Sequence, residues 1–127
     1  MYLNVVILTK KFGLFTALNN VSIDVESNEF VRLLGPSGCG KTTMLRIIAG
    51  LTETDSGSVS LQGENLTGLS ARMRGFGIVF QSYSLFPNMT VRQNIGYGLK
   101  IRGVAQTDID KRTSELLDIV KLPNMSD

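Results

Sequence analysis

Residues 35–42 decide the fold class, and they read Gly35-Pro36-Ser37-Gly38-Cys39-Gly40-Lys41-Thr42. This stretch matches G-x-x-x-x-G-K-[ST], the pattern of a phosphate-binding loop that connects a strand to a helix. Residues 30–34 form a short apolar run before it, and residues 41–51 place apolar side chains at helical spacing after it. The sequence therefore predicts an α/β fold built around this loop.

The residue types of the loop suit a bound phosphate. Glycines let the backbone wrap around an anion with its N–H groups pointing inward, and the helix that follows adds partial positive charge. Lys41 supplies a charge for the β and γ phosphates, the Thr42 hydroxyl can ligate Mg²⁺, and we expect Thr43 to donate to a phosphate oxygen. Cys39 occupies a free position of the motif. It is either a tolerated small residue or, because the helix terminus can lower its pKa, a redox switch.

Further strands are predicted on both sides of the loop by apolar or alternating patterns. They cover residues 5–8, 21–25 and 58–61. Residues 76–80 form another apolar run, typical of a strand buried on both faces of a parallel sheet.

Three more helices are predicted, and two of them carry end signals. They cover residues 66–73, 90–97 and 107–122. Thr90 is the expected N-cap of the second helix, whereas Thr107 and Asp110 resemble a capping box and Pro123 a stop for the third. Because no repeat or linker-like stretch is present, we expect one domain with no internal boundary.

The composition excludes several functional classes. The 127 residues are 43% hydrophobic and 19% charged, the balance of one compact soluble domain. A net charge of +2 is far from what nucleic-acid binding requires, so we expect no nucleic-acid partner. One cysteine favours a reducing compartment, the cytoplasm, and the absence of histidine removes that residue as a catalytic base. No stretch approaches the roughly 18 apolar residues of a membrane span, so membrane contact is expected to need a partner.

From residue 11 to residue 103 the chain resembles the ATP-binding subunit of ABC transporters. The resemblance rests on Lys11-Phe12-Gly13, Ala17-Leu18, Val21-Ser22, the loop with Thr43, the sequence of residues 45–51, and Val79-Phe80-Gln81. It implies a P-loop NTPase fold with an antiparallel β subdomain, part of a parallel sheet with helices, and the start of a helical subdomain. Residues 1–127 would then be part of one nucleotide-binding domain, with ATP and Mg²⁺ as ligands.

The same resemblance assigns roles to two residues outside the loop. An aromatic side chain upstream of the loop stacks on adenine in this family, and Phe12 holds that position. A glutamine after a buried strand reaches Mg²⁺ and the attacking water, and Gln81 holds that one. Without the resemblance, Phe12 would be read as a core or strand-edge aromatic and Gln81 as a solvated loop residue.

The segment 81–91 looks like the importer branch that serves polyamines, iron(III) and aminoalkylphosphonates. The resemblance implies that Tyr83, Leu85 and Phe86 form an apolar socket for a transmembrane permease subunit. The alternative is that these three side chains pack in the core of the helical subdomain. A second ATP-binding subunit is the implied dimer partner, and the implied location is cytoplasmic, on the inner face of the plasma membrane.

Three features of the family are missing from this sequence. It has no Ser-Gly-Gly signature, no apolar run that ends in Asp-Glu (the Walker B motif), and no histidine. We therefore expect the 127 residues to carry the Walker A and Q-loop half of the site, to bind nucleotide at best weakly and to hydrolyse it negligibly. Arg32 also departs from the family, because it lies in the predicted strand before the loop. Either a carboxylate pairs with it or that strand is loose.

Three hypotheses follow. The first is the N-terminal part of an importer ATPase that energises solute uptake. The second is a non-catalytic remnant or interaction module that occupies a permease through its apolar segment. The third is an ABC-type ATPase of DNA maintenance, which the near-neutral charge disfavours.

Overall fold

The structure is a computed structural model of the chain, and it describes residues 1–82 and 84–122. The chain folds as two compact units, Met1–Ile78 and Val79–Asp127, where the sequence pattern predicts no boundary. Between Arg74 and Val91 the described residues contain no helix or strand.

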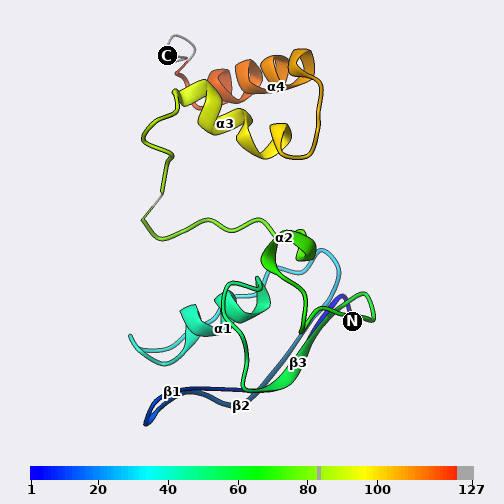
Figure 1. The fold of residues 1–127 in the computed structure, drawn as a ribbon, viewed down its shortest axis with the longest axis vertical. Helices are drawn as coiled ribbons and strands as arrows, with labels where there is room; N and C mark the ends of the chain where they lie inside the picture. The colour runs from blue at the N-terminus through cyan, green and yellow to red at the C-terminus, as the bar shows by residue number, and fades with distance from the viewer. Residues whose placement is uncertain (83, 123–127) are drawn as a thin grey trace. The chain divides into compact units, whose positions relative to one another are not determined.

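The first unit is built on an antiparallel sheet in the order β2-β1-β3-β4 (Figure 1). Its strands are β1 (Leu3–Phe12), β2 (Phe15–Val25), β3 (Ser56–Leu61) and β4 (Glu64–Asn65). Strands β1 and β2 form a hairpin in which Phe12 pairs with Phe15. Gly13 makes the tight turn between them with a φ of 58°, a backbone region that favours glycine. The strands predicted over residues 5–8, 21–25 and 58–61 are confirmed.

Helix α1 (Lys41–Ile48) lies against one face of this sheet (Figure 1). The core between them consists of buried apolar side chains: Val5, Leu8, Leu18, Met44, Ile47 and Val59. The predicted helix after the loop is confirmed, although it ends before residue 51, because Gly50 turns the chain with a φ of 76°. Helix α2 (Ala71–Arg74) is shorter than the helix predicted over residues 66–73.

The described residues of the second unit form two helices, α3 (Val91–Lys100) and α4 (Gln106–Ile119). Thr90 caps α3 as predicted, because its hydroxyl accepts from the Gln93 N–H and the Gln93 side chain accepts from the Thr90 N–H. The predicted Thr107–Asp110 capping box is wrong. The N-cap of helix α4 is Ala105, two residues earlier than Thr107, and Asp110 accepts instead from the side chain of Gln106. The predicted stop at Pro123 lies outside the described residues. Among those residues no helix is both long and apolar enough to cross a bilayer.

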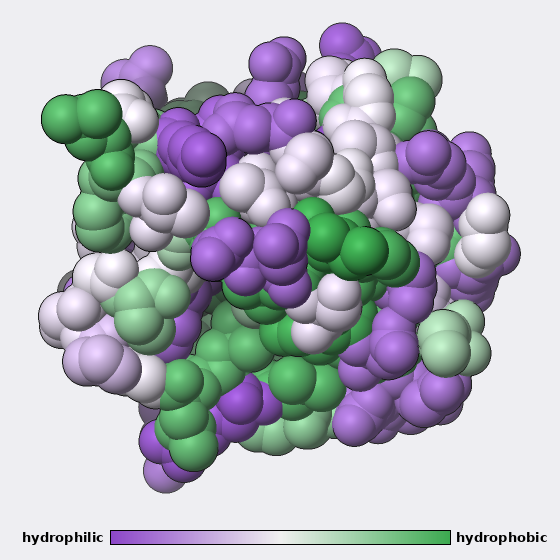
Figure 2. Space-filling view, turned by 90° about the horizontal axis from the view of Figure 1, so that it is seen from below, coloured by the Kyte–Doolittle hydropathy of each residue, from purple (hydrophilic) through white to green (hydrophobic). Residues whose placement is uncertain are grey.

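The two apolar runs expected to form a parallel sheet, residues 30–34 and 76–80, are not strands in this structure. Phe30 is 92% exposed and Val79 is 87% exposed. A fully apolar strand needs hydrogen-bonded neighbours and a layer on each face, whereas every described strand pairs with others of the antiparallel sheet. Apolar surface therefore remains on the molecule, and Figure 2 shows such surface near the middle of one face.

Candidate functional site

Residues 35–39 of the loop are exposed. Gly35, Gly38 and Gly40 have φ values of 155°, 81° and 90°, in the region that favours glycine. A Cβ atom at Gly38 would meet no heavy atom within 4 Å, so nothing shields this part of the loop. Pro36, Ser37 and Cys39 are also exposed, and the Cys39 N–H donates to the Pro36 carbonyl oxygen at 3.4 Å. An anion can therefore reach the surface of the loop.

Gly40 fixes the loop against the sheet. It is buried, and a Cβ atom there would lie 2.3 Å from the carbonyl oxygen of Ala17 and 2.8 Å from Cδ2 of Leu18. Ala17 and Leu18 belong to β2, so the loop rests directly on the hairpin that carries Phe12 at its tip. Only glycine combines this close approach with the positive φ.

Lys41 concentrates positive charge at the loop. Its Nζ donates to the carbonyl oxygens of Gly35 and Pro36, each at 2.7 Å, and contacts the Cys39 sulfur at 3.2 Å. The first turn of α1 contains no acidic residue, so nothing opposes the positive end of the helix dipole. The ammonium group and the helix terminus together favour a negatively charged ligand.

Cys39 responds to this charge. Its thiol is exposed, and the hydrogen bond from the Lys41 side chain lowers its pKa from the ordinary value of a cysteine. The sequence predicted a lowered pKa from the helix terminus, whereas the main cause in the structure is the neighbouring lysine. Whether the thiol acts as a redox switch stays a prediction.

The donors of the loop fit a triphosphate with Mg²⁺. Thr42 is exposed in the first turn of α1 and Thr43 is half-buried beside it. Accessible backbone amides, a lysine ammonium and a threonine hydroxyl supply the groups that phosphate oxygens and a phosphate-bound Mg²⁺ require.

Phe12 and Gln81 lie in different units. Phe12 ends β1 with half of its side chain exposed, and Lys10 Nζ lies 5.5 Å from the centre of its ring. The structure joins this hairpin to the loop through the contact of β2 with Gly40. Gln81 is exposed in a turn of the second unit, so its role beside Mg²⁺ stays a prediction.

The predicted socket residues differ in their surroundings. Leu85 is 72% exposed. Phe86 packs on Tyr97 of α3, with ring centres 4.7 Å apart, and its N–H donates to the side chain of Asn94. Tyr83 lies outside the described residues. Phe86 is still 45% exposed despite this packing, so neither Leu85 nor Phe86 is buried in a core, and the socket stays a prediction.

Arg74 is a residue that the sequence analysis did not single out. Its side chain is only 7% exposed, and its guanidinium donates to carbonyl oxygens of Ile47, Ile48, Thr67 and Leu69 at 2.7–2.9 Å. Burial lowers its pKa from the ordinary value of an arginine. The side chain thus caps the carbonyl end of α1, the helix whose other end carries the loop. In the sequence, the basic pair Arg72 and Arg74 is the only pattern that could have pointed to this role, and it lies more than 20 positions after Gly50, where α1 ends.

Arg32, in contrast, is exposed, and the segment around it is not a strand. Of the two alternatives in the sequence analysis, the structure supports the loose segment, because no described carboxylate forms a salt bridge with Arg32.

Comparison with known proteins agrees with this geometry. The family model described as ABC transporter matches residues 18–127. The chain therefore belongs to the ABC transporter family, and its fold is the N-terminal part of a P-loop NTPase domain of that family.

Several relatives are importer subunits. The chain is 54% identical to a spermidine/putrescine import ATP-binding protein PotA of Nitrosospira multiformis, over 92% of this chain and 32% of that protein. It is 47% identical to a sulfate/thiosulfate import ATP-binding protein CysA of Mesostigma viride, over 93% of this chain and 34% of that protein. The chain thus spans about a third of the length of these relatives.

Solved structures of ABC cassettes share the fold. A bacterial ABC transporter cassette solved as a dimer matches with a TM-score of 0.86 and 28% identity, over 98% of this chain and 60% of that chain. A post-hydrolysis state of an ATP-binding cassette, bound to ADP and Pi, matches with a TM-score of 0.84 and 30% identity, over the same shares.

Proposed function

We propose that this chain supplies the Walker A and Q-loop half of the ATP-binding site of an ABC importer, with Mg²⁺ held by the nucleotide and the Thr42 hydroxyl. One observation carries the proposal: the open glycine loop around the Lys41 ammonium, anchored on the sheet through Gly40. Such a loop at a helix N-terminus binds phosphates through backbone donors and one point charge. The importer assignment is supported by the names of the relatives.

The solute is proposed to be a small charged one. Relatives named for a polyamine cation and for sulfate match this chain at similar identity, 54% and 47%. This part of the domain therefore does not distinguish the sign of the solute's charge, and we assign solute selection to other subunits. The spermidine/putrescine relatives favour polyamine-like uptake, with iron(III) and aminoalkylphosphonates as the other candidates from the sequence.

Two protein partners belong to the proposal. One is a permease subunit, whose cytoplasmic segment would meet the exposed Leu85 in the segment after Gln81. The other is a second ATP-binding subunit, as in the dimeric cassette that the chain resembles. In this arrangement the protein is a cytoplasmic subunit on the inner face of the plasma membrane.

An ATP titration tests the proposal. Isothermal calorimetry would compare the parent chain with Lys41→Met, and Lys111→Met is the matched control because Lys111 is an exposed lysine of α4. We expect Lys41→Met to weaken Mg-ATP binding by about tenfold or more, the effect of losing a hydrogen bond to a charged group, and Lys111→Met to leave it unchanged. Equal affinity in all three proteins, or no binding by the parent, rejects the proposal. Phosphate release by the 127 residues alone is expected to be negligible.

A further inference from the structure

A corner of the chain made of Thr54 and Asp55, between α1 and β3, holds the end of β1. The Asp55 N–H and the Thr54 hydroxyl both donate to the carbonyl oxygen of Thr9, each at 3.0 Å. The Asp55 carboxylate accepts from Lys10 Nζ at 2.8 Å and from the backbone N–H of Lys11 at 2.6 Å. No motif in the sequence marks Asp55, yet its carboxylate binds two successive residues of a strand.

These contacts hold β1 beyond the point where its pairing with β3 ends. The pairing of β1 with β3 ends at Thr9 and Ser56. Beyond Thr9, strand β1 would have only β2 beside it, and an isolated two-stranded hairpin is marginally stable. Asp55 supplies an acceptor on the open side of β1 for Lys11, one residue before Phe12. The carboxylate thus ties down the part of the hairpin that carries the aromatic ring.

Asp55 also fixes the charge that lies over this ring. The register between β1 and β2 is irregular on both sides of Lys10, yet the Lys10 side chain reaches the Phe12 ring. Lys10 Nζ lies 5.5 Å from the ring centre, within the range of a cation–π contact, and its side chain is 14% exposed. The hydrogen bonds from Lys10 and Lys11 hold the pKa of Asp55 below its usual range, so the carboxylate is charged at neutral pH. About half of the Phe12 surface remains exposed.

The same hairpin touches the phosphate loop. Lys10 pairs with Leu18 across the two strands, and Leu18 is one of the two residues against which Gly40 packs. Asp55 itself follows α1 along the chain, and Arg46 of that helix donates to Thr52 at 3.2 Å. The hairpin is therefore in contact with the phosphate loop through Gly40 and with the chain that follows α1 through Asp55.

We propose that Asp55 is a positioning residue for the nucleotide base: by binding Lys10 and the Lys11 backbone, it holds the Phe12 ring in place to stack on a purine. This inference rests on the proposed function, because it concerns the base of the nucleotide whose phosphates the loop binds. The inference divides the affinity for ATP into a part that comes from the base and a part that comes from the phosphates. The base-dependent part requires Asp55, and the phosphate-dependent part does not.

The test compares two probes, Mg-ATP and magnesium tripolyphosphate, by calorimetry on the full 127-residue chain. The variants are Asp55→Ala, Asp55→Asn and Phe12→Ala, and Glu53→Ala is the matched control because Glu53 is an exposed carboxylate two residues away. Stacking on an aromatic side chain corresponds to a change of about 5- to 100-fold, which we expect for Phe12→Ala with ATP. For Asp55→Ala we expect at least about a threefold loss with ATP and no change with tripolyphosphate.

Two further results bear on the inference. Asp55→Asn retains an acceptor for the Lys11 N–H but loses the charge, so it should lie between the parent and Asp55→Ala. Adding Asp55→Ala to Phe12→Ala should weaken ATP binding no further, because the ring is already gone. Glu53→Ala should match the parent with both probes.

The unwanted outcomes are distinct. If Asp55→Ala weakens both probes equally, the residue has only a general structural role and the inference fails. If Phe12→Ala weakens ATP binding while Asp55→Ala does not, it fails as well, with the proposed function intact. If the parent binds neither probe, the proposed function fails and this inference falls with it.

Discussion

Replacing Gly40 by alanine tests whether the close approach of the loop to the sheet is required. The new Cβ atom would lie 2.3 Å from the Ala17 oxygen, and the residue would have to keep a φ of 90°. The left-handed backbone costs about 1 kcal/mol and overpacking against a rigid strand about 2 kcal/mol more. We therefore expect the free energy of unfolding of the first unit to fall by about 3 kcal/mol. With a urea m-value of about 1.5 kcal/mol/M, the unfolding midpoint falls by about 2 M.

Gly38→Ala is the matched control for this prediction. Gly38 has a similar φ of 81°, but a Cβ atom there meets no heavy atom within 4 Å. Only the backbone term remains, about 1 kcal/mol, which corresponds to a shift of about 0.7 M in urea. Far-UV circular dichroism, together with hydrogen exchange of the β1 and β2 amides, would follow the first unit. Equal midpoints for the two variants would refute the argument that the loop is pressed onto β2.

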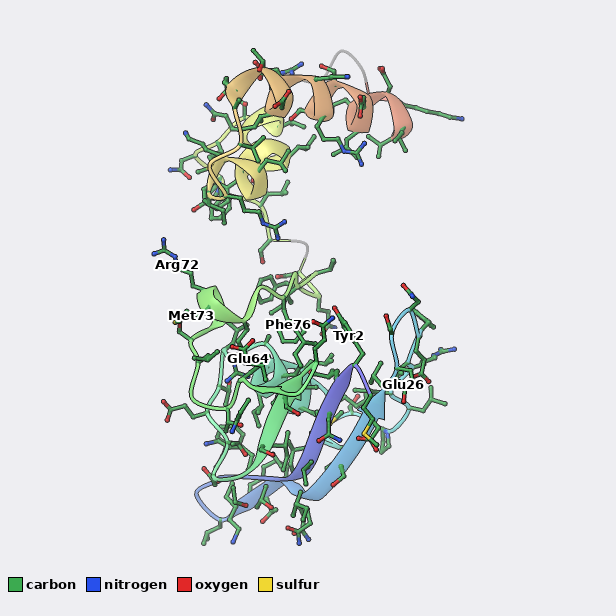
Figure 3. The ribbon with its side chains drawn as sticks, turned by 90° about the vertical axis from the view of Figure 1, so that its right-hand side faces the viewer. Tyr2, Glu26, Glu64, Arg72, Met73 and Phe76 are labelled. Atoms are coloured by element: carbon green, nitrogen blue, oxygen red, sulfur yellow. The ribbon has the colours of Figure 1, made fainter. Side chains whose placement is uncertain are left out.

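Other substitutions test the remaining structural claims. Arg74→Met should lower the free energy of unfolding by about 3 kcal/mol, because it leaves the carbonyl end of α1 without hydrogen bonds in a buried site. Arg72 lies on the same helix with its side chain in solvent (Figure 3), so Arg72→Met should change the free energy of unfolding by less than about 0.5 kcal/mol. Gly96→Ala should destabilise the second unit by about 2 kcal/mol, because the new Cβ atom would lie 2.7 Å from Ile109. Gly98 has open space around it, so Gly98→Ala should stabilise α3 by about 0.5 kcal/mol. Thermal unfolding followed by circular dichroism measures both changes, and equal changes would contradict the packing of Gly96 on Ile109. Lys41→Met should raise the pKa of the exposed Cys39 thiol, moving the pH profile of its alkylation by iodoacetamide to higher pH, and an unmoved profile would exclude the contact between the two side chains.

The parts of the fold that could be predicted are those that local patterns determine. Alternation along β2 and the Thr90 cap of α3 are visible within a few residues, and both are confirmed. The apolar runs at 30–34 and 76–80 could not be assigned this way, because whether such a run is a strand depends on the strands beside it. The predicted N-cap of α4 was wrong by two residues, because extended backbone at Ala105 begins the helix without a side-chain cap.

In the candidate site too, residues within the local motif could be predicted, whereas residues with distant partners could not. The glycine spacing and Lys41 could be read directly from the motif, since the loop geometry lies within eight residues. The burial of Arg74 could not, because its partners come from residues 47–48 and 67–69, which only the folded chain brings together. Asp55 escaped notice for the same reason, since its partner Lys10 is 45 positions away along the chain.

The guanidinium of Arg74 has a mechanical consequence. It bonds the carbonyl end of α1 and the chain before α2 at the same time, so one side chain links the two short helices. Helix α1 begins at the glycine loop, and helix α2 ends at Gly75, after which the chain continues to Gln81. Moving α1 away from α2 would therefore break hydrogen bonds in a buried site, so a shift of one helix costs free energy unless the other follows.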